Sequence, residues 1–254
     1  SVQEHSNSNF GEGNIESIYF EPHVLDTSSR GHYCLESEID SAWYFPGAIS
    51  SECSESLLRY LNAPSPHPSS SCRWHELSSR RLRLWGSFPE AADVVAGYEN
   101  SDQNGLGNLH HEKDVALPVW LAGLAQQLHT SGLLLTPQPP NHVLVNQYAP
   151  GQGILHHSDG PCYSPHVAIL SLGAPTILSF RRHLRSAEIG VANGYNIEEQ
   201  QENCERSGTD QPVLSLVLQP DSLVVFSGEL YVSHLHGIEP QRVHEVVDSH
   251  CANM

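Results

Sequence analysis

The feature that most constrains the fold is a series of short strand-like segments in the second half of the chain. Five segments are rich in β-branched and apolar residues, and Gly or Pro lies in nearly every gap between them; they span residues 142–148, 167–172, 176–180, 213–218 and 223–226. No long helical pattern separates the segments, and short strands in direct succession favour antiparallel sheets. The series therefore predicts a mainly β fold whose sheets close as a jelly roll.

Helical patterns occur in the first half of the chain. Residues 50–62 carry leucines at helical spacing, and Leu117-Pro118 begins a second apolar-faced segment that includes Trp120. Trp43-Tyr44-Phe45-Pro46 has the composition of a short strand. The sequence therefore predicts an α+β architecture in which N-terminal helices flank the jelly-roll core. We expect Trp85 and Trp120 to be core aromatic residues.

Two polar segments divide the chain into predicted regions. Residues 1–40 mix Ser, Asn, Glu and Gly without apolar periodicity, which predicts a disordered acidic N-terminal tail. Residues 183–212 form a polar stretch that we interpret as an insertion, either a surface loop or a lid. The segment 41–254 is predicted to be one domain, because a chain of 254 residues with 39% hydrophobic positions buries one sizeable core.

Charge and cysteine usage limit the expected partners and compartment. With 12 Lys and Arg against 29 Asp and Glu, the formal net charge is −17, so any contact with nucleic acid is expected to be local. The basic residues before Trp85 are predicted to be solvated surface; they are Arg73, Arg80, Arg81 and Arg83. Six cysteines without a C-x-x-C pair, and no apolar run of roughly 18 residues, predict a protein of the cytoplasm and nucleus with no membrane partner.

His157-Ser158-Asp159 is the segment that points to chemistry. Two metal-binding side chains at i and i+2 lie on the same face of an extended strand, and His234 and His236 offer a third ligand downstream. Two imidazoles and one carboxylate form a set that binds Fe(II) and leaves positions open for an oxo-acid and O2. A closed structural zinc site would need a fourth ligand. The pattern predicts a metal site made by His157, Asp159 and either His234 or His236.

Several motifs resemble those of the AlkB-type 2-oxoglutarate- and Fe(II)-dependent dioxygenases, and most closely the subfamily of the sixth AlkB homologue. In the second half these motifs are Asn146-Gln147-Tyr148, Pro150-Gly151, His157-x-Asp159-Gly160-Pro161, Ser171-Leu172-Gly173 and His236-Gly237-Ile238. The resemblance extends upstream through Trp43-Tyr44-Phe45-Pro46, Asn62-Ala63-Pro64, Leu84-Trp85-Gly86 and Leu117-Pro118-x-Trp120-Leu121. It covers roughly residues 41–240.

The resemblance implies a double-stranded β-helix core and an enzyme that couples oxidative decarboxylation of 2-oxoglutarate by O2 to hydroxylation of a C–H bond. Carried over by position, His157, Asp159 and His236 would hold Fe(II). Asn146 and Tyr148 would hydrogen-bond the carboxylates of 2-oxoglutarate. The expected substrate is a methylated nucleic-acid base, with a protein side chain as the second candidate.

One family motif, R-x-S-x-T-x-R on a final core strand, has no match after the last histidine. Only Arg242 follows His236, and a bidentate guanidinium is the group that anchors a distal carboxylate. The final core strand is therefore predicted to be missing from the segment 41–254. Two alternatives to the dioxygenase follow: a catalytically impaired binding protein of the same fold, and a metal-binding jelly roll of cupin type without 2-oxoglutarate.

Overall fold

The computed structural model describes residues 18–35, 42–63, 73–86, 117–159, 163–182, 212–240 and 251–253. The helical elements are α1 (Pro22–Leu25), the 3-10 helix η1 (Arg30–Tyr33), α2 (Ser51–Asn62), α4 (Val119–Thr130) and α6 (Gly228–Val232). The strands are β1 (Ala42–Phe45), β2 (His75–Glu76), β3 (Arg81–Gly86), β4 (His142–Gln147), β5 (Ile154–His157), β6 (His166–Leu170), β7 (Thr176–Arg182), β8 (Leu214–Leu218), β9 (Leu223–Ser227) and β10 (His234–Ile238). In this part of the chain, no helix is long and apolar enough to cross a membrane.

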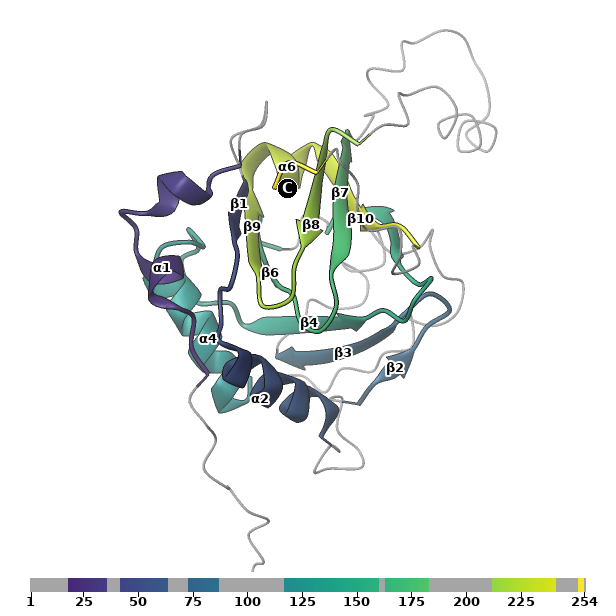
Figure 1. Cartoon of the computed structure of the whole chain (residues 1–254), viewed down its shortest axis with the longest axis horizontal. Coiled ribbons are helices and arrows are strands. Elements are labelled where there is room, and N and C mark those ends of the chain that lie inside the picture. Colours follow the sequence, from purple (N-terminus) through teal and green to yellow (C-terminus); the bar gives the residue numbers. More distant parts are fainter. Residues whose placement is uncertain are drawn as a thin grey trace, which may run out of the picture.

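The strands form three sheets in which every pairing is antiparallel (Figure 1). Their orders are β1-β9-β6, β5-β10-β7-β8 and β2-β3-β4. The first two sheets pack face to face, because Leu178 and Phe180 of β7 lie in one buried cluster with Val224 and Phe226 of β9. The predicted mainly β architecture with a jelly-roll core is confirmed.

Strand β9 has a continuous apolar sequence because both of its faces are buried. Val224 and Phe226 point into the space between the two sheets, whereas Leu223 and Val225 belong to a cluster under the helices. All four side chains are 0% exposed. Strands buried on both faces lose the apolar-polar alternation of half-exposed strands, so β9 fixes the sheets and the helical layer to each other.

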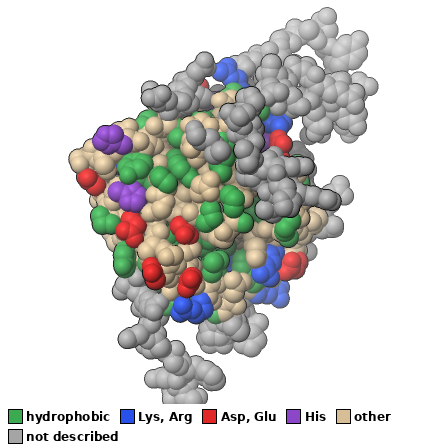
Figure 2. All heavy atoms as spheres, viewed as in Figure 1, with side chains coloured by type: hydrophobic (Ala, Val, Ile, Leu, Met, Phe, Trp, Pro, Cys, Tyr) green, Lys and Arg blue, Asp and Glu red, His purple; other side chains and the backbone are tan. Residues whose placement is uncertain are grey.

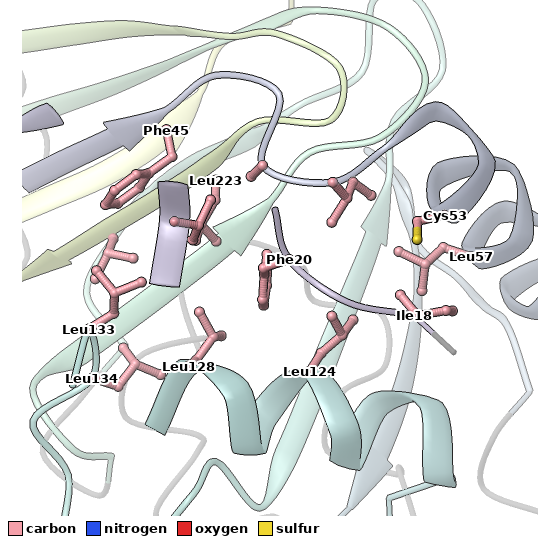
Figure 3. Packing of buried hydrophobic residues seen from close by; sticks show 14 residues of the cluster. Ile18, Phe20, Phe45, Cys53, Leu57, Leu124, Leu128, Leu133, Leu134 and Leu223 are labelled. Atoms are coloured by element: carbon pink, nitrogen blue, oxygen red, sulfur yellow. The ribbon is translucent and has the colours of Figure 1, made fainter. Parts of the chain in front are cut away.

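Residues 18–35 correct the prediction that residues 1–40 form a disordered tail. Ile18 and Phe20 pack against Leu124 and Leu128 of α4 in a buried cluster (Figure 3). Gln127 of α4 accepts a hydrogen bond from the Phe20 N–H at 2.9 Å and donates one to the Ile18 carbonyl at 3.2 Å. A few well-placed apolar residues order this polar segment, and composition averaged over forty residues concealed them. Residues 1–17 and 36–40 lie outside the described part.

The basic cluster before Trp85 also differs from the prediction. Arg80 and Arg83 are only 3% and 5% exposed, so two of the four arginines are buried rather than solvated. Arg83 donates to the Leu61 carbonyl at 2.5 Å and to the Ala63 carbonyl at 3.2 Å, at the C-terminal end of α2. A cation there satisfies carbonyls that have no partner within the helix. Arg83 therefore fastens α2 to the sheet that contains β4.

The prediction of a core tryptophan is confirmed for Trp85, and Trp120 is half-buried against the same cluster. Trp85 is 6% exposed, and its ring centroid lies 6.0 Å from that of Trp120 in an edge-on arrangement. Val143 and Val145 of β4 pack on this cluster. Because side chains alternate along a strand, His142, Leu144 and Asn146 point to the other face of β4.

Two predicted features lie outside the described residues. Residues 183–211, the bulk of the predicted polar insertion, and residues 241–250, which contain Arg242, are not described. The insertion and the missing final core strand therefore stay predictions. Beyond them, the Ala252 N–H donates to the Ser215 carbonyl at 2.9 Å, and the Asn253 amide bonds both backbone groups of Val217, so residues 251–253 lie along the edge of β8.

Candidate active site

His157 and His236 come together because β5 and β10 are neighbouring strands. The pairing register places His236 opposite His157, and the two ring centroids are 4.5 Å apart. The ring of His236 also contacts Phe226 and Phe180, with centroids at 5.3 and 6.2 Å. Both phenylalanines are 0% exposed, so the imidazole of His236 lies against an apolar wall in the core of the jelly roll.

Two glycines permit this close pairing of β5 with β10. A Cβ atom added at Gly237 would lie 2.9 Å from the backbone nitrogen of His156, and one added at Gly153 would overlap the carbonyl of Ile238. Both contacts are with backbone, which has little freedom to move away. The register that places His157 opposite His236 therefore depends on glycine at both positions.

Asp159 completes a group of three possible metal ligands. Its Oδ1 atom lies 3.8 Å from Nε2 of His157 and 3.8 Å from Nε2 of His236. The three donor atoms all lie within 4.8 Å of one another, and no other group of three or more such residues was found among the described residues. Two ligands bound to one metal at right angles lie about 3 Å apart, so small side-chain rotations bring these donors into one coordination sphere.

The structure also separates His236 from His234, which the strand pattern alone left as alternatives. His234 is 2% exposed and does not belong to the three-residue group. Its Nδ1 atom lies 3.1 Å from the carbonyl oxygen of Glu229. His234 is thus held at the α6 end of the strand, and His236 is the third member of the site.

The ring of His157 is oriented for metal binding by its own backbone. Its Nδ1 atom lies 2.8 Å from the carbonyl of Leu155. A carbonyl only accepts hydrogen bonds, so Nδ1 carries the proton and Nε2 keeps its lone pair. Histidine ligands of metals usually donate their second ring nitrogen in this way. The geometry therefore presents Nε2 of His157 toward Asp159 and His236.

Burial disfavours the charged forms of the side chains in this site. It raises the pKa of Asp159, an effect that the neighbouring His157 partly opposes. Burial also lowers the pKa of His236 to about 3, with further lowering by His157 and His156. Both shifts show that the site poorly stabilises separate charges. A divalent cation bound by neutral imidazoles and an ionised carboxylate compensates for this, so the donor set fits Fe(II).

The two residues expected to bind the co-substrate lie at the end of β4. Asn146 is on the face of the strand that points away from the tryptophan cluster, and Tyr148 follows the last residue of the strand. The Oδ1 atom of Asn146 accepts a hydrogen bond from Nε of Arg80 at 3.1 Å. The role of Asn146 and Tyr148 in holding 2-oxoglutarate stays a prediction.

Sequence reasoning missed two components of this site and one buried neighbour of Asn146. The glycine pair, the wall made by Phe180 and Phe226, and the buried Arg80 were not foreseen. Gly153 immediately precedes β5 and Gly237 lies within β10, and a glycine inside a strand pattern is a readable sign of close backbone approach. The positions of the aromatic rings and of Arg80 depend on contacts between distant segments, which no local pattern encodes.

A jelly roll with two imidazoles, one carboxylate and no fourth protein ligand in the described group defines the class of non-haem metal-dependent oxygenases. Comparison with known proteins gives the family. Residues 41–251 match the family described as the 2OG-Fe(II) oxygenase superfamily, and the chain belongs to this superfamily. Its cofactors and co-substrates are Fe(II), 2-oxoglutarate and O2.

Individual relatives place the chain among the AlkB-like members. It is 30% identical over 223 residues to a Danio rerio protein named "Probable RNA/DNA demethylase ALKBH6", and the alignment covers 87% of this chain and 79% of that protein. A solved structure titled "The structure of OsALKBH1" matches the fold with a TM-score of 0.50 at 12% identity, covering 81% of this chain and 87% of that chain. The predicted resemblance and the double-stranded β-helix fold are confirmed, and a dioxygenase is favoured over both alternatives.

Proposed function

We propose that this chain oxidises an N-methyl group on a nucleic-acid base, with 2-oxoglutarate and O2 as co-substrates. The observation that carries the proposal is the close grouping of His157, Asp159 and His236 at the centre of the jelly roll. The choice of substrate is supported by the similarity to a relative named as a probable RNA/DNA demethylase. The reaction is balanced: one oxygen atom enters the methyl group, the other enters succinate, and CO2 is released.

In this proposal, His157, Asp159 and His236 hold Fe(II), and the bound iron supplies the activation of O2 and of the oxo-acid. The Leu155 carbonyl keeps the His157 ring in the orientation that leaves Nε2 for the metal. Phe180 and Phe226 cover one side of His236 and exclude water from it. The amide of Asn146 and the hydroxyl of Tyr148 donate to carboxylates of 2-oxoglutarate. Hydroxylation of an N-methyl group gives a product that breaks down to formaldehyde and the demethylated base.

The charge distribution favours a substrate bound by a few local contacts. The formal net charge of −17 opposes a long grip on a polyanion. On the face shown in Figure 2, Lys and Arg side chains lie in small separate groups, with acidic side chains between them. A single extruded or unpaired base needs only such a local surface. Localisation in the cytoplasm and nucleus remains a prediction consistent with this substrate.

The test is turnover of methylated oligonucleotides by the Fe(II)-loaded protein. Single-stranded RNA and DNA with defined N-methylated bases are incubated with 2-oxoglutarate, and formaldehyde and succinate are measured together. The expected result is equal formation of the two products, lost in His157→Ala and retained in the matched variant His156→Gln. The ring of His156 lies 2.8 Å from the Ser179 hydroxyl and is not one of the three candidate ligands. The proposed substrate class would be contradicted if succinate formed at the same rate with and without every methylated oligonucleotide and no formaldehyde appeared.

A further inference from the structure

Arg80 is a buried cation beside Asn146, one of the residues expected to bind 2-oxoglutarate. It is 3% exposed, and a guanidinium is kept in the interior only when charged or polar partners compensate for its lost hydration. Its hydrogen-bond partners include two side chains: Nε donates to Oδ1 of Asn146 at 3.1 Å, and Nη1 lies 3.5 Å from Oγ of Ser79. Arg83, the other buried arginine described, instead bonds backbone carbonyls at the end of α2. The two arginines therefore serve different neighbours.

The turn that holds Arg80 also contacts the segment leading to the metal-binding strand. The Leu77 N–H donates to the Arg80 carbonyl at 2.8 Å, which closes the turn between β2 and β3. The Ser79 carbonyl then accepts a hydrogen bond from the N–H of Gly153 at 3.2 Å, one residue before β5. Arg80 thus lies in a turn that bridges β4, through Asn146, and the start of the strand that carries His157.

The contact with Arg80 fixes which way the Asn146 amide faces. A guanidinium only donates hydrogen bonds, so the amide atom beside Nε has to be the carbonyl oxygen. The Nδ2 group, with its two N–H donors, is consequently turned away from Arg80. Leu82, the residue paired with Asn146 across the sheet, is 1% exposed, so the amide is held between a buried strand and a buried cation. Its donor side is set in advance.

We propose that Arg80 is a positioning residue for the co-substrate: it locks the Asn146 amide so that the Nδ2 group donates to a carboxylate of 2-oxoglutarate. This inference rests on the proposed function, in which Asn146 binds the co-substrate. It adds a cation from the turn before β3 to a site otherwise built from β4, β5 and β10. Because the Asn146 amide is already fixed, no side-chain conformational entropy has to be lost when 2-oxoglutarate binds. Preorganisation of this kind increases affinity.

The experiment is a double-mutant cycle on the affinity for 2-oxoglutarate. Titration calorimetry on Mn(II)-loaded protein measures the dissociation constant without turnover, for the unchanged chain, Arg80→Met, Asn146→Ala and the double variant. Arg80→Met is expected to weaken binding about tenfold, the effect of losing one charge-assisted hydrogen bond. If Arg80 acts through Asn146, the same substitution has little further effect in the Asn146→Ala background.

Two controls separate positioning from general support. Arg83→Met removes a buried arginine from the same strand and is expected to lower the melting temperature while leaving the affinity for 2-oxoglutarate unchanged. Asn146→Asp keeps an acceptor for Arg80 but has no N–H to donate, so it is expected to fold and to bind 2-oxoglutarate poorly. If Arg80→Met does not fold, Arg80→Lys, which keeps a buried cation but lacks the Nε donor, is expected to weaken 2-oxoglutarate binding in the same way; full affinity in that variant would overturn the inference.

Additive effects of Arg80→Met and Asn146→Ala would overturn the inference while leaving the proposed function intact. Full affinity in Asn146→Asp would overturn the inference together with the assignment of Asn146 to the co-substrate. Failure of the unchanged Mn(II)-loaded chain to bind 2-oxoglutarate would overturn both. Retained Mn(II) binding in His157→Ala would instead count against the assignment of the metal ligands alone. Failure of that assignment is therefore distinguishable from failure of the positioning role of Arg80.

Discussion

His157 and His236 lie opposite each other on β5 and β10, with ring centroids 4.5 Å apart. Seventy-nine positions separate them in the sequence (236 minus 157), so their approach is a product of the sheet and not of any local motif. The pairing of β5 with β10 tolerates no shift in register, because a shift by one residue would turn His236 to the opposite face of the sheet. The metal site is therefore as stable as the β5-β10 pairing.

This dependence predicts a strong effect of Gly237→Ala. The added Cβ atom would meet the backbone of His156 at 2.9 Å, which forces β5 and β10 apart. We expect metal affinity to fall at least tenfold, as for other changes that reorient metal ligands, measured by competition with a metal-sensitive dye.

Gly123→Ala is the matched control for that variant. Gly123 lies inside α4, and a Cβ atom there would meet nothing within 4 Å. Alanine at this helical position is expected to stabilise the fold by up to about 1 kcal/mol and to leave metal affinity unchanged. Equal metal affinity in Gly237→Ala and Gly123→Ala would refute the role assigned to the close strand pairing.

The order of residues 18–35 predicts that Phe20 contributes to folding. Phe20 is 3% exposed and packs in the cluster formed with α4, whereas its neighbour Tyr19 is 50% exposed. Phe20→Ala should lower the free energy of unfolding by about 3–5 kcal/mol, and Tyr19→Ala should change it by less than about 0.5 kcal/mol. Urea denaturation of both variants measures the difference. Similar values for the two would mean that this segment is not part of the core.

Protonation of His142 on β4 should contribute to the pH dependence of folding stability. Burial lowers the pKa of its imidazole below the ordinary value of 6.5. The unfolded chain therefore takes up this proton at a higher pH than the folded chain, so stability is full above pH 6.5 and decreases as pH falls through that value toward the folded pKa. His142→Gln should lose less stability than the unchanged protein between pH 7.5 and 5.5 in urea denaturation. Equal loss of stability in His142→Gln and in the unchanged protein over this range would contradict the burial of a neutral imidazole at His142.

Local patterns in the sequence predicted the strands and most of the metal site. The i and i+2 spacing of His157 and Asp159 places both on one side of an extended segment whatever its partners are. Alternation and turn residues likewise located β4 and β6 to β9. These features depend on a few neighbouring residues. The structure confirms the strands and brings His157 and Asp159 together, and their role as metal ligands stays a prediction.

Features that depend on distant contacts were not predictable in the same way. The choice between His234 and His236 required the pairing register of β10. The burial of Arg80 and Arg83 required an amide on β4 and carbonyls on α2, and the order of Ile18 and Phe20 required the face of α4. Average composition describes such polar segments as solvated, because it does not contain their partners.

The central claim is that His157, Asp159 and His236 bind Fe(II) beside a site for 2-oxoglutarate. Anaerobic addition of Fe(II) and 2-oxoglutarate to the protein, followed by visible absorption spectroscopy, tests it most directly. The account predicts a charge-transfer band that needs both additions, is absent in His157→Ala and persists in His156→Gln. Absence of the band in the unchanged protein, or its persistence in His157→Ala, would contradict the account.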